Sequence, residues 1–423
     1  MIFLEKLVIR GKRRLEGEID IQGAKNSLLP ILAATVLVEG VSVIHNCPCL
    51  SDVDAAIRIL EYLGCKVRRE KDTLYVDSGN ITCYNIPQNL MREMRSSIIF
   101  LGSLLGRMKK AGMSFPGGCE IGLRPIDLHL SSLETLGVTI DKRSADICCE
   151  VKDKITPAVI SLSFPSVGAT ENIILACALS EGRTTVLNAA REPEIADLAA
   201  FLNKCGCNIT IDSKGTVIID GVRKLHGCEY SVMPDRIVAI TYMCAVGVTG
   251  GNVVLKNADP SSVMSVIPVF EKAGCKVHKS KNSIRIISDG NLNSVKDIRT
   301  LPYPGFPTDA QAPVMAMLSV ARGTGIIVEN IFESRYKHVP ELLSMGANIK
   351  IEGKVAIIDG TEKLHGAEVS ATDLRGGAAL VVAALGAEGM THIAGLNHID
   401  RGYEKIEVCL KKVGADIERR EEV

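Results

Sequence analysis

The chain has 423 residues, of which 49 are Lys or Arg and 49 are Asp or Glu, so its formal net charge is zero. This balance, without any block of basic residues, argues against a nucleic-acid partner. The apolar runs are far shorter than the roughly 20 residues of a membrane-spanning helix. Glu5 and Lys6 also put charge where a signal peptide would be apolar. We therefore expect a cytoplasmic protein without membrane attachment, long enough for two domains.

The chain contains fourteen cysteines, and their spacing predicts neither a disulfide framework nor a metal site. The close pairs Cys47-Pro48-Cys49, Cys148-Cys149 and Cys205-Gly206-Cys207 lack a second pair at the spacing of a zinc finger. We expect most of these cysteines to be buried and to pack as small apolar side chains.

Six apolar segments follow one another along the chain, each without the polar stripe of a surface helix. They cover residues 28–38, 98–105, 170–178, 237–246, 312–320 and 378–385. A helix that is apolar on all sides must be buried on all sides, so these segments predict six core helices.

A glycine that leads directly into an alternating strand follows each apolar segment. These glycines are Gly64, Gly137, Gly206, Gly274, Gly346 and Gly414, about 70 residues apart by their numbering. Glycine is favoured just after a helix because it readily adopts a left-handed conformation. We therefore predict six copies of one unit. This period exceeds the ~20–50 residues of a solenoid repeat, so two closed domains of three copies each are expected, divided near residues 232–234.

Short polar residues stand at the starts of five of these helices and are expected to cap them. They are Asn26-Ser27, Ser166, Asp235, Thr308-Asp309 and Thr372-Asp373. If the helices of one domain run parallel, their N-termini gather at one end, with partial positive charge and free N–H groups. This arrangement favours an anionic ligand and leaves its identity open.

One loop, residues 116–128, has the composition of a reactive thiol site. Cys119 follows Gly117 and Gly118, and Arg124 comes five residues later. Glycines allow the backbone to move, and a nearby guanidinium favours the thiolate form of cysteine. The loop therefore predicts a reactive Cys119.

This loop resembles the active-site loop of the UDP-N-acetylglucosamine 1-carboxyvinyltransferase family of enolpyruvyl transferases. Other segments match the same family in order and span nearly the whole chain. They are residues 23–27, 94–98, 166–170, 190–195, 306–309, 372–375 and 398–404. An ordered set of this size is far more specific than any one of its members.

The resemblance implies an α/β fold of two inside-out, barrel-like domains, each built from three βαβαββ repeats. It places the first domain at residues 23–233, and the second at residues 234–423, completed by residues 1–22. It implies transfer of the enolpyruvyl group from phosphoenolpyruvate to the 3′-hydroxyl of UDP-N-acetylglucosamine with release of phosphate. That reaction is the first committed step of peptidoglycan synthesis, on which the cell wall, cell shape and cell division depend. A monomer acting on these small molecules, with no cofactor and no metal, is implied.

The resemblance implies four catalytic residues: Cys119, Asp309, Lys25 and Arg401. Asp309 would take the proton of the sugar hydroxyl, and Cys119 would protonate the vinyl carbon and be alkylated by fosfomycin. Lys25, and Arg401 with Arg124, would hold the charges of phosphoenolpyruvate. The residues alone leave an alternative for Asp309, because Asp235 and Asp373 at comparable helix starts are typical caps. Asp373 is a second candidate for carrying the proton.

The resemblance also implies a set of substrate-binding residues. Besides Lys25, Asp309 and Arg401, these are Asn26, Arg95, Arg124, Pro125, Ile126, Asp127, Leu128, Phe164, Pro165, Ser166, Val167, Ile331, Arg335, Asp373 and Arg375. The sequence departs from some relatives at Phe164, where they have a lysine. It also departs at residues 310–313, which include Pro313, where the family more often has a bulkier Met or Leu and then Gln. His129 is assigned no role.

Two other functions compete with this interpretation. A 3-phosphoshikimate 1-carboxyvinyltransferase would share the fold and the donor, but that family lacks the cysteine loop. A paralogue that binds the sugar nucleotide without catalysis is disfavoured because Lys25, Cys119, Arg124, Asp309 and Arg401 are all present.

Overall fold

The computed structural model describes residues 4–114, 126–141 and 146–422. These residues form two compact units. The first unit contains residues 23–114, 126–141 and 146–233, and the second contains residues 4–22 and 234–422. The chain thus passes between the units after Gln22 and again after Met233.

The first unit holds the helices α1 (Lys25–Thr35), α2 (Ser51–Leu63), α3 (Gln88–Glu93), η1 (Arg95–Ile99, a 3₁₀ helix), α4 (Phe100–Met108), α5 (Asp127–Thr135), α6 (Val167–Cys177) and α7 (Pro193–Lys204). Its strands are β3 (Val38–Glu39), β4 (Val41–His45), β5 (Lys66–Glu70), β6 (Thr73–Asp77), β7 (Asn85–Ile86), β8 (Lys110–Ser114), β9 (Thr139–Asp141), β10 (Asp146–Glu150), β11 (Val159–Ser161), β12 (Gly182–Leu187), β13 (Asn208–Ile211), β14 (Val217–Gly221), β15 (Leu225–His226) and β16 (Glu229–Ser231).

The second unit holds the helices α8 (Arg236–Thr249), η2 (Pro260–Val263), α9 (Ile267–Lys272), α10 (Thr308–Leu318), α11 (Val339–Ser344), α12 (Leu374–Gly386), α13 (Leu396–Ile399) and α14 (Ile406–Lys412). Its strands are β1 (Leu4–Arg10), β2 (Leu15–Asp20), β17 (Gly251–Lys256), β18 (Lys276–Ser280), β19 (Ser283–Ser288), β20 (Ile298–Arg299), β21 (Thr324–Val328), β22 (Asn348–Glu352), β23 (Val355–Asp359), β24 (Glu368–Ser370), β25 (Met390–Ala394) and β26 (Asp416–Glu422).

Three four-stranded sheets in each unit share one strand arrangement. Their orders are β16-β4-β6-β5, β7-β8-β10-β9 and β11-β12-β14-β13 in the first unit, and β2-β17-β19-β18, β20-β21-β23-β22 and β24-β25-β1-β26 in the second. In each, an edge strand pairs in parallel with its neighbour, and the other two pairings are antiparallel. The predicted repetition of one unit is therefore confirmed at the level of the sheets.

The N-terminal strands complete two sheets of the second unit. β1 lies between β25 and β26, and it pairs antiparallel with both. β2 pairs in parallel with β17, from Leu15 opposite Gly251 to Asp20 opposite Lys256. These sheets therefore combine strands from the two ends of the sequence.

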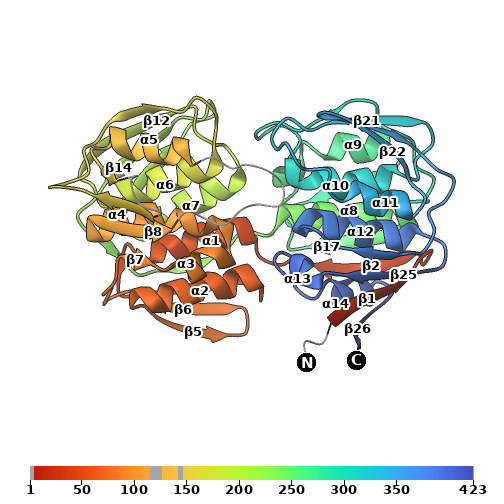
Figure 1. The fold of residues 1–423 in the computed structure, drawn as a ribbon, viewed down its shortest axis with the longest axis horizontal. Coiled ribbons are helices and arrows are strands. Elements are labelled where there is room, and N and C mark those ends of the chain that lie inside the picture. The colour runs from red at the N-terminus through yellow and green to blue at the C-terminus, as the bar shows by residue number, and fades with distance from the viewer. Residues whose placement is uncertain (1–3, 115–125, 142–145, 423) are drawn as a thin grey trace. The chain divides into compact units, whose positions relative to one another are not determined.

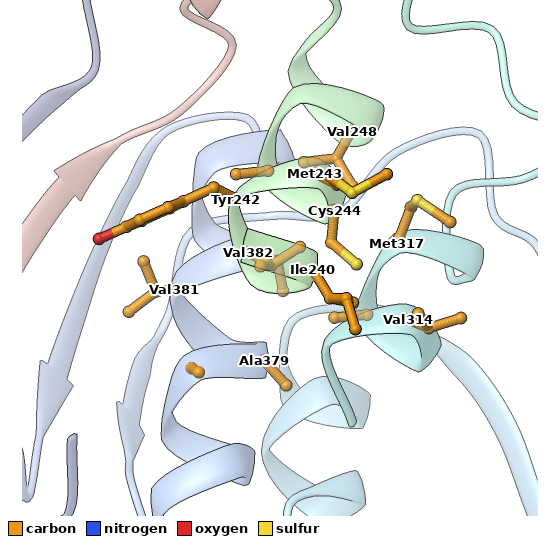
Figure 2. Close-up of a cluster of buried hydrophobic side chains, with 14 of the residues drawn as sticks. Ile240, Tyr242, Met243, Cys244, Val248, Val314, Met317, Ala379, Val381 and Val382 are labelled. Atoms are coloured by element: carbon orange, nitrogen blue, oxygen red, sulfur yellow. The ribbon is translucent and has the colours of Figure 1, made fainter. Parts of the chain in front are cut away.

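The apolar helices lie inside the sheets (Figure 1). In the second unit, α8, α10 and α12 pack against one another, and Figure 2 shows Met243 and Cys244 of α8 beside Met317 of α10 and Val382 of α12. At Gly247 the approach is so close that an added Cβ would lie 2.7 Å from the Met317 sulfur. The six predicted core helices are confirmed as buried elements.

The six predicted glycine junctions are confirmed. Each of these glycines has a positive φ, from 84° at Gly137 to 106° at Gly64. Each is followed within two residues by a strand. Residues with a Cβ rarely adopt this left-handed conformation, which is why glycine recurs at this place in every repeat.

The predicted helix caps are correct in three cases and wrong in two. The side chains of Ser166, Asp235 and Asp373 accept hydrogen bonds from main-chain N–H groups in the first turns of α6, α8 and α12. α1 begins after Ala24 and α10 after Pro307, so Asn26-Ser27 and Thr308-Asp309 lie inside their helices and do not cap them. The side chains of Ser27 and Asp309 instead bond to residues far along the chain.

Of the thirteen cysteines in the described residues, eight are buried. The expectation that most of them pack as small apolar side chains is confirmed for this part of the chain. No helix among the described residues has both the length and the apolar character needed to cross a membrane.

Candidate active site

Asp309 is held by two arginines of the second unit. It is the second residue of α10, and its Oδ1 accepts a hydrogen bond from Arg335 Nη2 at 2.5 Å. Its Oδ2 accepts one from Arg375 Nη2 at 3.1 Å. Both guanidinium groups are almost completely buried, whereas the Asp309 side chain is 25 % exposed. The carboxylate is thus oriented from its buried side and remains accessible from the other.

Arg375 connects this carboxylate to a buried phenol. Its Nη1 donates to the Tyr403 hydroxyl at 3.2 Å, which is 2.8 Å from Thr241 Oγ1 on α8. Burial lowers the pKa of Arg375. Its interactions with Asp309, Tyr403 and Asp235 together outweigh this effect and raise the pKa above its ordinary value. Burial also raises the pKa of Tyr403. At neutral pH, therefore, a neutral phenol supports a permanently charged guanidinium.

Asp373 and His338 lie beside the same arginines. Asp373 Oδ1 accepts the main-chain N–H groups of Arg375 and Gly376, at 3.0 and 2.9 Å, and so fixes the start of α12. His338 is 1 % exposed, and no described residue meets either of its ring nitrogens with full hydrogen-bond geometry. Burial lowers the pKa of His338 to about 4. The charge of Asp373 and the main chain of Arg335 act to raise this pKa, and the charge of Arg335 acts to lower it. His338 is therefore neutral at pH 7.

Glu329 organises the main chain at the start of α10. It is 1 % exposed, and its carboxylate accepts the hydroxyls of Thr300 and Thr308 at 2.8 and 3.0 Å. It also accepts the main-chain N–H groups of Ile331 and Phe332, at 2.8 and 3.1 Å. The half-buried Ile331 is thus tied to the residue that precedes Asp309.

Arg401 lies on the turn after α13 and is half-buried. Two residues later Tyr403 contacts Arg375, so this turn adjoins the Asp309 group. The turn is fastened to the N-terminal segment, because Gln22 Nε2 donates to the Gly402 carbonyl and Gln22 Oε1 accepts the Glu404 N–H. The second unit thus brings Asp309, Arg335, Asp373 and Arg375 together, with Arg401 on an adjoining turn.

In the first unit, Lys25 forms a buried ion pair. Its Nζ lies 3.0 Å from Asp52 Oδ2, and the two side chains are 9 % and 3 % exposed. Lys25 begins α1, and Asp52 lies in the first turn of α2. Asn26, the next residue, is exposed. A lysine amine is therefore fixed at a helix start, where partial positive charge favours anions.

Arg95 begins η1 and is half-buried, close to the ring of His129. Burial lowers the pKa of His129 to about 4, and the charge of Arg95 adds to this effect. The neutral ring lies 2.8 Å from Asn172 Nδ2, which also donates to the Ile98 carbonyl at 3.2 Å. Asn172, in the middle of α6, thereby links His129 of α5 to Ile98, near the end of η1. The histidine for which the sequence suggested no role positions these helices.

The remaining predicted residues of the first unit lie on exposed or half-buried segments. Phe164 is 44 % exposed, and Pro165, Ser166 and Val167 are half-buried at the start of α6. Asp127 is exposed at the start of α5, between half-buried Ile126 and Leu128. Cys119, Arg124 and Pro125 fall outside the described residues.

Two prolines alter the helices that carry Asn26 and Asp309. Pro30 lies inside α1 and Pro313 inside α10, each four residues after the candidate residue. Proline has no N–H, so neither donates the usual helix bond to the main-chain carbonyl of Asn26 or Asp309. The departure at Pro313 therefore reproduces in α10 the geometry of α1.

Four of the residues that build these sites were missed at the sequence level: Asp52, Glu329, His338 and Tyr403. Each is buried, and its neighbours in the site include residues distant along the chain. Tyr403 lies in the matched segment 398–404, but no role was predicted for it. Among the described residues, no group of three His, Cys, Asp or Glu side chains could hold a metal ion.

The three-repeat units and their cationic helix starts define a class of group-transfer enzymes. A family model described as EPSP synthase (3-phosphoshikimate 1-carboxyvinyltransferase) matches residues 9–410. The chain belongs to this family of enolpyruvyl transferases.

Curated relatives cover the chain almost completely. UDP-N-acetylglucosamine 1-carboxyvinyltransferase 2 of Caldanaerobacter subterraneus subsp. tengcongensis is 52 % identical, over 98 % of this chain and 99 % of the relative. UDP-N-acetylglucosamine 1-carboxyvinyltransferase of Gluconobacter oxydans is 46 % identical, over the same shares of the two chains.

Solved structures show the same fold. The enolpyruvyl transferase NikO from Streptomyces tendae aligns with a TM-score of 0.89 and 24 % identity, covering 100 % of both chains. EPSP synthase from Acinetobacter baumannii aligns with a TM-score of 0.77 and 16 % identity, covering 99 % of this chain and 100 % of that one. The predicted α/β fold with three βαβαββ repeats in each of two domains is confirmed.

Proposed function

We propose that this chain transfers the enolpyruvyl group of phosphoenolpyruvate to the 3′-hydroxyl of UDP-N-acetylglucosamine and releases phosphate. The observation that carries the proposal is the near-complete match to relatives of that name at 52 % and 46 % identity. The EPSP synthase structure shares only 16 % of its sequence with the chain, which disfavours a shikimate phosphate acceptor.

The proposed base is Asp309. An ionised carboxylate can accept a proton, and Arg335 and Arg375 stabilise that charge while fixing both oxygens. Proton transfer to Asp309 would accompany attack of the sugar oxygen on C2 of phosphoenolpyruvate. Cys119 would deliver a proton to C3. The C2–O bond to phosphate would then break while the Cys119 thiolate takes a proton back from C3. This elimination forms the enol ether and releases phosphate.

The proposed anion-binding groups lie in both units. Lys25, with Arg124 and Arg401, would bind the phosphate and carboxylate of phosphoenolpyruvate, where fixed charges stabilise the transition state. Asn26, Arg95, the start of α5 and residues 164–167 would contact the sugar nucleotide, as would Ile331 of the Glu329 turn. The proposal includes a place in the cytoplasm, at the first committed step of peptidoglycan synthesis, which serves cell shape and division.

The decisive experiment measures phosphate release with phosphoenolpyruvate and each of two acceptors, UDP-N-acetylglucosamine and shikimate 3-phosphate. We expect release only with the sugar nucleotide. Equal release without an acceptor, or release only with shikimate 3-phosphate, would contradict the proposal. Cys119→Asp, which keeps a proton donor, and Cys119→Ala, which does not, test the acid. Alkylation by fosfomycin is expected in the wild type and in neither variant.

A further inference from the structure

Two thiols of the first unit lie in direct contact outside the candidate active site. Cys205 Sγ is 3.4 Å from Cys228 Sγ, and both cysteines are in the reduced form. Cys205 follows the last residue of α7, and Cys228 lies between β15 and β16. The proposed transfer reaction uses neither residue.

The pair lies at one end of a contact between α7 and the segment that contains β16. Asp197, Phe201 and Cys205 follow one another at four-residue spacing and so share one face of the helix. Asp197 accepts a hydrogen bond from the Tyr230 hydroxyl at 2.5 Å and another from the Met233 N–H at 3.2 Å. The rings of Phe201 and Tyr230 meet edge to face, with 5.6 Å between their centroids.

Main-chain hydrogen bonds hold the two cysteines in position relative to each other. The Cys205 main chain is held by its own N–H, which donates to the Phe201 carbonyl, and by its carbonyl, which accepts the His226 N–H. The Cys228 carbonyl accepts the Val43 N–H at 2.8 Å. A disulfide requires a sulfur–sulfur distance of about 2.05 Å. The two sulfur atoms must therefore approach by roughly 1.4 Å, a movement within reach of side-chain rotation.

The two thiols differ in access and in acidity. Cys205 is completely buried, whereas Cys228 is only half-buried. The hydrogen bond from Cys205 lowers the pKa of Cys228, against the effect of burial, and the neighbouring Lys204 charge acts in the same direction. The same hydrogen bond, together with burial, raises the pKa of Cys205. A partly accessible thiol with a lowered pKa, 3.4 Å from a buried thiol, is the arrangement of an attacking and a resolving cysteine.

We propose that Cys205 and Cys228 form a reversible disulfide by exchange with a low-molecular-weight disulfide. The Cys228 thiolate attacks one sulfur of the small disulfide, which releases one small thiolate and leaves a mixed disulfide on Cys228. Cys205 then attacks the Cys228 sulfur, loses its proton to solvent, and releases the second small thiolate. Two protein thiols are oxidised, and one small disulfide is reduced to two thiols.

Neighbouring cysteines do not compete for the same partner. Cys207 lies two residues from Cys205, but its sulfur is directed at the Ala178 and Asp220 carbonyls, at 3.8 and 3.9 Å. Cys148 is exposed on β10, next to buried Cys149, whose side chain points to the other face of the strand. The proposed disulfide is therefore specific to one pair.

The test exposes the full chain to oxidised glutathione, blocks remaining thiols with N-ethylmaleimide, and maps tryptic peptides by mass spectrometry. We expect a cross-link between peptides 205–214 and 225–236 that dithiothreitol reverses. Peptide 205–214 also contains Cys207, so the Cys207→Ser variant, in which the cross-link should persist, assigns the bond to Cys205. The Cys148→Ser variant, which removes an exposed thiol elsewhere, should cross-link like the wild type.

Single variants separate the two roles. Cys205→Ser should accumulate glutathione on Cys228, and Cys228→Ser should leave Cys205 unmodified because that thiol is buried. The proposal is overturned if wild-type Cys228 retains glutathione without cross-linking, stays unmodified, or pairs with Cys207. If the Cys207→Ser variant fails to fold, fragmentation of the cross-linked wild-type peptide decides, because N-ethylmaleimide marks whichever of Cys205 and Cys207 is not bonded. The assay measures thiol chemistry, so its result is independent of the proposed transferase activity.

Discussion

The Lys25 amine and the Asp52 carboxylate form an ion pair at 3.0 Å that joins the starts of α1 and α2. Both side chains are buried, so water screens this ion pair only weakly. Removing one member of such a pair costs more than the pair contributes in total, because the remaining charge is left in an apolar environment.

Asp52→Asn is therefore expected to lower the free energy of unfolding by about 3 kcal/mol. The measurement is chemical denaturation followed by circular dichroism. Asp54→Asn is the matched control, because Asp54 is an exposed acid in the same helical turn. A loss of equal size in both variants would show that the helix dipole, and not the ion pair, carries the effect.

Arg375 is expected to be irreplaceable by lysine. Its guanidinium contacts Asp309 and the Tyr403 hydroxyl at once, which a single ammonium group cannot do in the same geometry. Losing one charged hydrogen bond costs about 1.5–3 kcal/mol, so Arg375→Lys should lower kcat/KM for phosphate release roughly ten- to hundredfold.

The control for this prediction is Arg299→Lys, which alters an exposed ion pair with Asp297. It should leave kcat/KM unchanged, since exposed pairs contribute little. If Arg375→Lys retained full activity, the orientation of Asp309 by Arg375 would not matter for turnover.

Glu329 is expected to support binding of the sugar nucleotide without touching it. Glu329→Gln weakens the acceptor for two hydroxyls and two N–H groups, which should cost about 2 kcal/mol of stability. Because the Ile331 turn loosens, KM for UDP-N-acetylglucosamine should rise more than kcat falls. Glu333→Gln, in the same loop but exposed, should change neither constant. Steady-state kinetics with each substrate varied in turn provides the comparison.

The two buried histidines predict loss of stability in mild acid. The pKa values of His129 and His338 in the folded chain are about 4, below the value of about 6.5 in an unfolded chain. Their stabilising contribution is complete above pH ~6.5 and is lost as the pH falls towards 4, because the unfolded chain binds protons first. Each histidine should account for about 3 kcal/mol over this range.

Denaturation midpoints at a series of pH values between 7 and 4 test this expectation. His338→Met, which replaces a buried titrating ring with an apolar side chain, should make the curve less steep. His278→Asn changes an exposed histidine and should leave the curve as it is. An unchanged slope in His338→Met would mean that His338 already binds its proton in the folded protein.

The repeated glycines and apolar segments predicted the buried helices and their ends because both patterns are local. A left-handed glycine after a helix can be recognised within about ten residues of sequence. So can a helix that is apolar on every side. The same local logic failed at Asn26-Ser27 and Thr308-Asp309. A polar side chain before an apolar run is typical of a cap, yet Asp309 bonds to arginines 26 and 66 residues further along the chain.

The candidate site could be anticipated only from its resemblance to a family. Nothing local indicates that Asp52 would face Lys25, that Glu329 would bind Thr308, or that His338 would lie buried beside Arg335. Those contacts depend on how three repeats close around one core, which determines the side-chain neighbours only after folding. The roles of Cys119 and Arg124 remain predictions.

The position of β1 between β25 and β26 sets an order of events during synthesis. The ribosome makes β1 first and β26 more than 400 residues later, since they cover residues 4–10 and 416–422. All strands of the first unit's sheets are complete once residue 231 has been made. The first unit can therefore acquire its sheets while translation continues. β2 can pair as soon as β17 ends at residue 256, whereas β1 must wait for β25 and β26.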